Sequence, residues 1–121
     1  MREKKTLVIG ASLKPDRYSY KAINMLVSNN IETKAYGLRE GEIAGIEIDT
    51  ELLPYSHIDT VSLYVNKNRQ PDLYNYIISL KPKRVIFNPG TENTEFQELL
   101  LKENIAFEEA CTLVLLSTKQ Y

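Results

Sequence analysis

The sequence has very few of the residues on which enzymes and metal sites most often depend. Its 121 residues include one cysteine, one histidine and no tryptophan. The single Cys111 excludes an internal disulfide, and together with the single His57 it is too little for a metal cage. A Ser–His–acid or Cys–His catalytic group is excluded as well, because His57 precedes a predicted strand, away from the expected site. We therefore expect no catalytic residue and no metal.

An excess of charge of either sign is also missing. Lys and Arg number 15 and Asp and Glu 16, for a formal net charge of −1. A groove for a nucleic-acid backbone normally gives a basic excess, so we expect no nucleic-acid partner. No apolar run approaches the roughly 18 residues that span a bilayer, and the charged residues 1–5 show no secretory signal. We expect one cytoplasmic domain over residues 1–121, without a membrane partner.

Short apolar runs alternate with segments of helical periodicity along the chain. Runs of this kind that end in glycine or turn residues are typical of strands buried on both faces. The pattern predicts an α/β fold in which helices cover both faces of a five-stranded parallel sheet. Residues 38–58 are expected to be irregular, with a short edge element at 46–48. Strands are predicted at 5–10, 31–36, 60–65, 84–87 and 105–107, and helices at 19–29, 70–80, from 94 onward and at 110–117.

Helix-end signals accompany these segments. Ser19 is predicted to cap the first helix, and Thr94 with Gln97 has the spacing of a capping box. Pro71 suits the first turn of the second helix. Asn30 suits a left-handed stop after the first helix.

The ends of the strands contain the candidate site. In parallel sheets ligands bind beyond the carboxyl ends of the strands, here at residues 10–12, 36–38, 65–67 and 88–90. Lys14, Arg17 and Lys21 lie near the start of the first helix, where the helix dipole disfavours cations. Their presence favours a bound phosphate.

The first turn does not match the common dinucleotide motif. Ser12 and Pro15 replace the second and third glycines of G-x-G-x-x-G. After the second strand, where NAD enzymes place an acidic residue, the chain has Arg39, which suits a phosphate better than a ribose hydroxyl. A nucleotide that carries an additional phosphate therefore fits better than NAD.

Several short motifs, in their order and spacing, resemble one known family. They lie at residues 8–12, 17–20, 43–45, 58–61, 85–90 and 109–111. On these motifs the chain resembles the small stand-alone CoA-binding proteins, a Rossmann-like family related to the amino-terminal domain of succinyl-CoA synthetase α subunits. The resemblance covers nearly the whole chain and implies a Rossmann-like three-layer α/β/α fold. The chain departs from the family at Tyr36-Gly37 and at Asn66, where an expected arginine is missing; Lys67 or Arg69 is a candidate substitute.

The resemblance also implies that coenzyme A, free or acylated, binds at the carboxyl edge of the sheet. The phosphates would be held by Gly10, Ala11, Ser12, Lys14, Arg17, Ser19 and Tyr20. The adenosine would be bordered by Gly37, Leu38, Arg39, Ile43 and Gly45. The pantetheine arm would pass Asn66, Asn88, Pro89 and Gly90.

Three other hypotheses compete with CoA binding alone. The chain is alternatively an NAD(P)-type nucleotide sensor or regulatory module, or a partner-binding domain with a vestigial pocket. A third alternative is a small thiol- or acyl-transfer enzyme that uses Cys111, although a lone cysteine in an apolar stretch is usually a buried structural residue.

Overall fold

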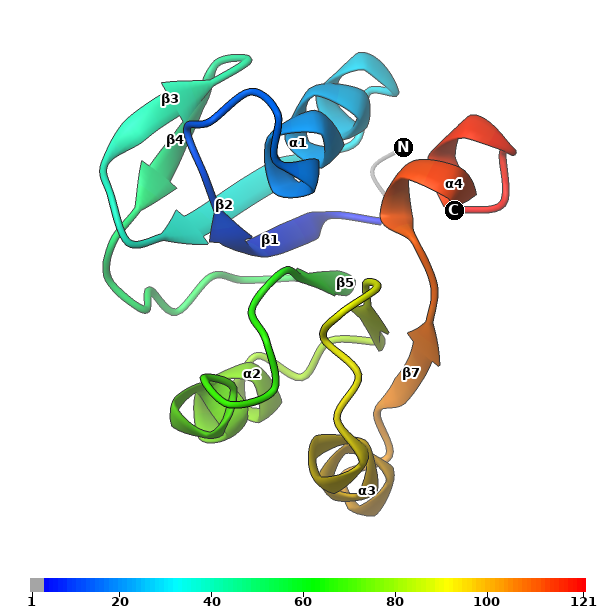
Figure 1. The fold of residues 1–121 in the computed structure, drawn as a ribbon. Helices are drawn as coiled ribbons and strands as arrows, with labels where there is room; N and C mark the ends of the chain where they lie inside the picture. The colour runs from blue at the N-terminus through cyan, green and yellow to red at the C-terminus, as the bar shows by residue number, and fades with distance from the viewer. Residues whose placement is uncertain (1–3) are drawn as a thin grey trace.

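The fold is a seven-stranded sheet with helices on both faces (Figure 1). The computed structural model describes residues 4–121, so the first three residues of the charged amino-terminal segment lie outside the described residues. The strand order is β3-β4-β2-β1-β5-β6-β7, and every neighbouring pair is parallel except β3 and β4. The strands are β1 (Thr6–Ala11), β2 (Thr33–Gly37), β3 (Gly41–Ile43), β4 (Ile46–Asp49), β5 (Thr60–Leu63), β6 (Arg84–Phe87) and β7 (Ala106–Glu109).

The sheet has two strands more than the five predicted, and both belong to a hairpin at one edge. The two-residue loop of this hairpin, Ala44 and Gly45, has φ of 52° and 83°, as in a type I′ turn. Ile43, before the loop, and Ile48, after it, are both buried in the same apolar cluster. The short edge element predicted at residues 46–48 is confirmed as β4, which pairs in parallel with β2, whereas the prediction of irregular structure was wrong at residues 41–43, which form β3.

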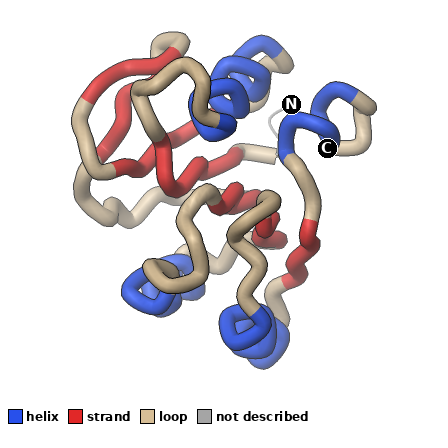
Figure 2. Tube along the Cα trace, in the orientation of Figure 1, coloured by secondary structure: helices blue, strands red, loops and turns tan. Residues whose placement is uncertain are grey.

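The helices form the two outer layers of the fold. Helices α1 and α4 cover one face of the sheet, and α2 and α3 cover the other (Figure 2). Among residues 4–121 no helix has the length and apolar character needed to cross a bilayer. The helices are α1 (Tyr18–Ser28), α2 (Tyr74–Ser79), α3 (Thr94–Lys102) and α4 (Thr112–Ser117), and a 3-10 turn, η1 (Pro71–Leu73), precedes α2.

Two predicted helix caps are wrong. Ser19 is buried inside the first turn of α1, and Arg17 occupies the N-cap position without a side-chain hydrogen bond. At α3 the cap is Asn93 rather than Thr94, because the Asn93 side chain accepts a hydrogen bond from the Phe96 amide at 3.1 Å. Both helices nevertheless begin within one residue of their predicted starts.

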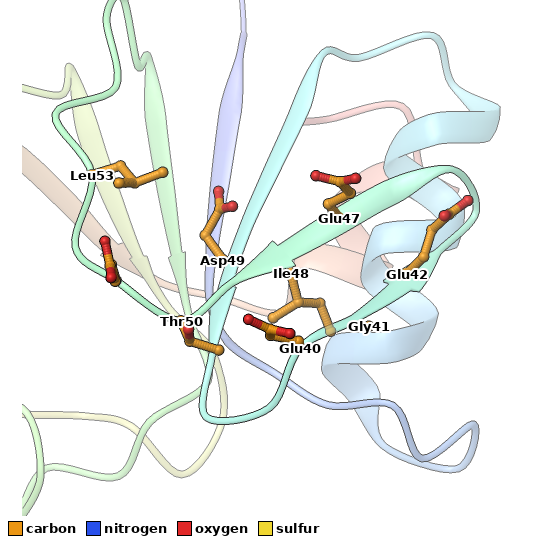
Figure 3. A pocket seen from close by; sticks show the side chains of 9 residues that line it. Glu40, Gly41, Glu42, Glu47, Ile48, Asp49, Thr50 and Leu53 are labelled. Atoms are coloured by element: carbon orange, nitrogen blue, oxygen red, sulfur yellow. The ribbon is translucent and has the colours of Figure 1, made fainter.

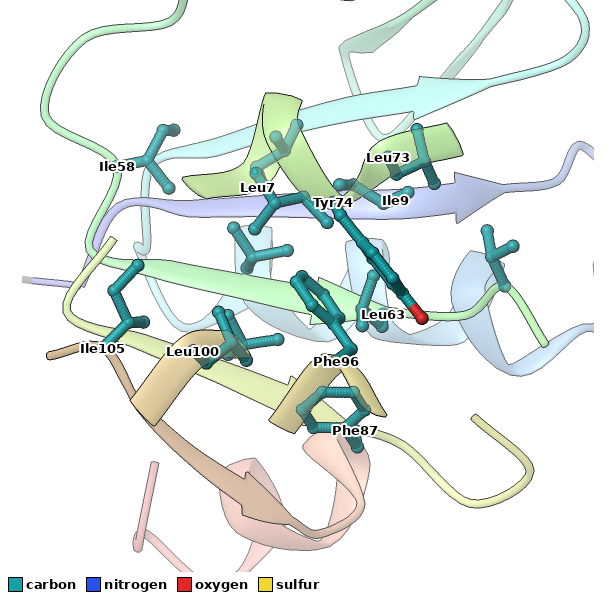
Figure 4. Packing of buried hydrophobic residues seen from close by; sticks show 14 residues of the cluster. Leu7, Ile9, Ile58, Leu63, Leu73, Tyr74, Phe87, Phe96, Leu100 and Ile105 are labelled. Atoms are coloured by element: carbon teal, nitrogen blue, oxygen red, sulfur yellow. The ribbon is translucent and has the colours of Figure 1, made fainter. Parts of the chain in front are cut away.

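The core consists of two apolar clusters, one on each face of the sheet. Because side chains alternate along a strand, β1 directs Leu7 and Ile9 to one face and Val8 to the other. On the first face the rings of Tyr74 and Phe96 stack with their centroids 4.5 Å apart (Figure 4). Strand β1 is thus buried on both faces, as predicted, and it ends in the turn that forms the candidate site.

Candidate functional site

A cavity of about 780 Å³ lies at the carboxyl ends of β1, β2 and β5. Strand β1 lies between β2 and β5, so this is the point at which the strand order reverses. Open α/β sheets bind ligands at such a point. The cavity is lined by Gly10, Ala11, Ser12, Leu13, Lys14, Arg17, Tyr36, Gly37, Leu38, Arg39, Tyr64, Val65, Asn68, Arg69, Asp72 and Leu73.

The cavity brings together the predicted residues that follow the first two strands. Strands β1 and β2 pair in parallel, so the loops after them lie side by side. The predicted residues in the lining are Gly10, Ala11, Ser12, Lys14, Arg17, Gly37, Leu38 and Arg39. The predicted residues outside the lining are Ser19, Tyr20, Ile43, Gly45, Asn66, Asn88, Pro89 and Gly90.

Asn88 shows why some predicted residues lie elsewhere. It is 1% exposed, and its side chain donates hydrogen bonds to Ser62 Oγ at 2.9 Å and to the Leu63 carbonyl oxygen at 2.8 Å. Its Oδ1 accepts from the Thr112 amide at 2.8 Å. Asn88 therefore joins the end of β6 to β5 and to the start of α4, and its polar atoms are engaged within the chain.

The segment after β5 supplies a wall that the sequence predicts only in part. Of the two cations considered as substitutes for the missing arginine, Arg69 lines the cavity and Lys67 does not. A helix that follows a parallel strand starts at the carboxyl edge of the sheet. Pro71, which is typical of a helix start, could therefore have indicated from the sequence that the residues next to it lie at this edge. The lining residues that sequence reasoning missed are Leu13, Tyr64, Asn68, Asp72 and Leu73.

Two glycines allow the backbones around the cavity to approach one another. Gly10 has φ of +98°, and a Cβ there would lie 2.9 Å from the carbonyl carbon and oxygen of Tyr64. At Gly37 a Cβ would lie 2.5 Å from the carbonyl oxygen of Ala11. Side chains at these positions would force the strand ends apart. Gly10, where a tight turn was predicted, lies inside β1 at a shift in the β1–β2 register, and its backbone lies directly against the end of β5.

The cavity is cationic although the chain as a whole is not. Lys14, Arg17, Arg39 and Arg69 line it together with one carboxylate, that of Asp72. All five side chains are exposed, and within residues 4–121 no salt bridge involves any of them. Cations that lack a carboxylate partner and surround one concave surface attract an anionic ligand.

The family to which the chain belongs follows from its sequence match. Residues 4–117 match the family described as CoA binding domain. The chain belongs to the CoA binding domain family. Comparison with curated proteins found no match.

Solved structures share the fold of this CoA binding domain. An uncharacterized protein is 47% identical with a TM-score of 0.95, and the match covers 98% of each chain. A hypothetical protein from Pyrococcus horikoshii OT3 is 21% identical with a TM-score of 0.83, over 92% of this chain and 80% of that chain. A protein from Thermus thermophilus is 18% identical with a TM-score of 0.84, over 98% and 92%. At these lower identities the likeness concerns the fold alone.

Among residues 4–121, the Tyr64 hydroxyl is the one buried side-chain polar atom of the CoA binding domain that lacks a hydrogen bond. Its residue lines the cavity, while its hydroxyl oxygen is buried. Burial raises the pKa of Tyr64 to about 12, and the nearby hydroxyls of Thr112 and Ser62 oppose this shift. The hydroxyl thus lies on the Ser62 and Thr112 side of the residue, buried from solvent.

A second cavity, of about 600 Å³, lies along the β3–β4 hairpin and has the opposite charge (Figure 3). Tyr55 donates a hydrogen bond to Asp49 at its edge. Within the described residues no group of three Cys, His, Asp or Glu side chains is arranged to hold a metal ion. Phosphates would be repelled here, so the candidate ligand site of the CoA binding domain is the cationic cavity. The carboxylates that line the second cavity are Glu40, Glu42, Glu47, Asp49 and Glu51.

Proposed function

We propose that this CoA binding domain holds coenzyme A or an acyl-CoA in the cationic cavity, without catalysing a reaction. The observation that carries the proposal is the grouping of four cations around the strand-reversal point of a chain from this family. Coenzyme A has a pyrophosphate and a 3′-phosphate, and both are favourable partners for such a group. The near-neutral charge of the whole chain does not oppose this, because the acidic residues of the second cavity lie on the hairpin.

In this proposal the pyrophosphate lies against residues 10–12 and the start of α1. That helix has eleven residues, no acidic residue in its first turn and no side-chain bond at its N-cap, so its first N–H groups are available to an anion. Leu38 is 70% exposed at the end of β2 and offers apolar surface to the adenine. Arg39, next to it, supplies charge for the 3′-phosphate.

The composition of the cavity supports binding without chemistry. No cysteine or histidine lines it. Cys111 lies at the N-cap of α4, and His57 lies in the turn before β5, at the amino ends of the strands. The competing transferase hypothesis predicts fast alkylation of Cys111 and loss of turnover in Cys111→Ala. The cytoplasmic location expected from the sequence stays a prediction.

Calorimetric titration of the purified chain with CoA, dephospho-CoA and NADPH tests the proposal. We expect CoA to bind, dephospho-CoA to bind about tenfold more weakly for want of one charge-assisted contact, and NADPH to compete poorly. Arg17→Ala should weaken CoA binding, whereas Lys83→Ala, which removes an exposed cation outside the cavity, should not. Absence of heat and of a thermal shift with CoA would overturn the proposal, and tighter binding of NADPH would favour the nucleotide-sensor alternative.

A further inference from the structure

A buried glutamine holds the loop after β5. Gln70 is 0% exposed, and its Nε2 donates hydrogen bonds to the carbonyl oxygens of Val65 and Thr91, each at 2.8 Å. Its Oε1 accepts from Nδ2 of Asn93 at 2.9 Å. Loss of these bonds would leave polar atoms unpaired in the core, which is costly. Gln70 therefore fixes the loop at residues 65–70 to the loop between β6 and α3.

Asn93 extends these contacts to two helices. Its Nδ2 also donates to the Tyr74 hydroxyl on α2 at 2.9 Å, and its Oδ1 accepts from the Phe96 amide in the first turn of α3. Tyr74 in turn donates to Glu95 Oε1 at 3.2 Å. The side chains of Gln70, Asn93 and Tyr74 form what we term the amide network. Because its members bond one another and three backbone groups, the network holds the loop in one position.

The loop anchored by the amide network contributes two side chains to the cavity. Asn68 and Arg69 line the cavity, whereas Lys67 in the same loop does not. The Arg69 amide donates to the Asn66 carbonyl at 3.0 Å, and the Asn68 amide donates to Asn66 Oδ1 at 2.9 Å. Arg69 directly precedes the anchored Gln70, so the anchor fixes the backbone from which the Arg69 side chain extends.

We propose that Arg69 contacts a phosphate of the ligand and that Gln70 and Asn93 are positioning residues that hold it at the cavity. The proposal rests on the proposed function, binding of CoA. A guanidinium binds phosphate through two parallel N–H bonds, so its contribution depends on orientation more than that of an ammonium. Because the orientation of the guanidinium matters, the buried and fully hydrogen-bonded Gln70 next to Arg69 should affect how tightly the ligand binds.

Titration of CoA into the full chain and four variants tests the inference. Arg69→Ala should weaken CoA binding about tenfold. Lys67→Ala removes the same charge from the same loop outside the cavity and should weaken binding less than about twofold. Gln70→Met keeps the side-chain length but removes its bonds, and we expect a loss of about fivefold. Asn93→Ser keeps a cap for α3 while removing the amide that reaches Gln70, so it tests the same point if Gln70→Met folds poorly.

A positioning role makes the effects non-additive. Gln70→Met combined with Arg69→Ala should bind CoA no more weakly than Arg69→Ala alone. If Gln70 has a structural role only, Gln70→Met lowers thermal stability with unchanged affinity, or causes equal losses in both backgrounds, and either result overturns the inference. Unchanged affinity in Arg69→Ala overturns the inference but not the proposed function. A wild-type chain that binds no CoA overturns both.

Discussion

Single residues shape the cavity by what they lack as well as by what they carry. Gly10, near the end of β1, has φ of +98° and lies directly against the end of β5. The absent side chain lets the backbone of the first turn lie between its two neighbours, where an anionic ligand can approach it.

Gly10→Ala should lower the free energy of unfolding by about 2–4 kcal/mol, because it combines backbone strain with a clash against the Tyr64 carbonyl. Gly45→Ala is the matched control, since Gly45 also has a positive φ but a Cβ there would meet nothing within 4 Å. Its loss should be about 1 kcal/mol, from strain alone. Urea unfolding measures both, and equal losses would contradict the role assigned to the contact.

Partly buried tyrosines make the fold sensitive to high pH. Burial raises the pKa of Tyr64 to about 12 and that of Tyr76 to about 12, against about 10 in an unfolded chain. The unfolded state therefore loses protons first, and stability that is complete below about pH 10 declines as the pH rises toward about 12.

Tyr64→Phe should make this decline of stability with pH shallower. At pH 7 it should leave stability unchanged or raise it, because the Tyr64 hydroxyl is buried at a cost and has no hydrogen-bond partner to lose. Urea unfolding at several pH values would refute this if wild type and variant declined equally.

At the scale of elements, helix starts and the edge hairpin organise the carboxyl edge of the sheet. The N-cap of helix α3 is Asn93, whose side chain both caps the helix and belongs to the amide network. The β3–β4 hairpin extends the sheet beyond β2 and carries the acidic second cavity. The hairpin thus lies on one side of the loops at the site, and the amide network lies on the other side.

The cap of α3 gives a prediction at this scale. Asn93→Ala should lower the free energy of unfolding by about 1–3 kcal/mol, because it removes a cap and the partner of a buried amide. Thr94→Ala should change it by less than about 0.5 kcal/mol, since Thr94 is exposed and does not cap the helix. Chemical unfolding followed by circular dichroism measures the difference. A larger loss in Thr94→Ala would restore the capping box predicted from the sequence.

The whole molecule separates its charges although they nearly balance. The cationic cavity lies at the ends of β1, β2 and β5, and the acidic cavity lies along the hairpin next to β2. A formal net charge of −1 therefore conceals two surfaces of opposite sign. An anionic ligand is attracted by one of them and repelled by the other.

This charge separation predicts a salt-dependent affinity. Raising the salt from about 50 to about 500 mM should weaken CoA binding by about tenfold, because the exposed cations of the cavity become screened. The loss should be smaller for dephospho-CoA, which has one phosphate fewer. Calorimetry at the two salt concentrations measures it, and a salt-independent affinity would show that the cations do not contact the ligand.

The sequence by itself determined the strand–helix alternation, the five parallel strands, the need for glycine at the end of the first strand and the family. These features depend on local patterns: apolar runs, helical spacing, and glycine where the backbone must turn. The loops after β1 and β2 were predicted as site segments for the same reason, since parallel pairing brings consecutive strand ends together.

Tertiary structure alone decided the rest, because burial and pairing depend on residues far apart in the chain. Asn88 is buried, and its side chain is hydrogen-bonded to β5 and to the start of α4. Ser19 is buried in the first turn of α1 and does not cap the helix. The hairpin is part of the sheet because β4 pairs in parallel with the edge of β2. Arg69, and not Lys67, came to line the cavity, in the loop that Gln70 anchors to a carbonyl 21 residues away in sequence.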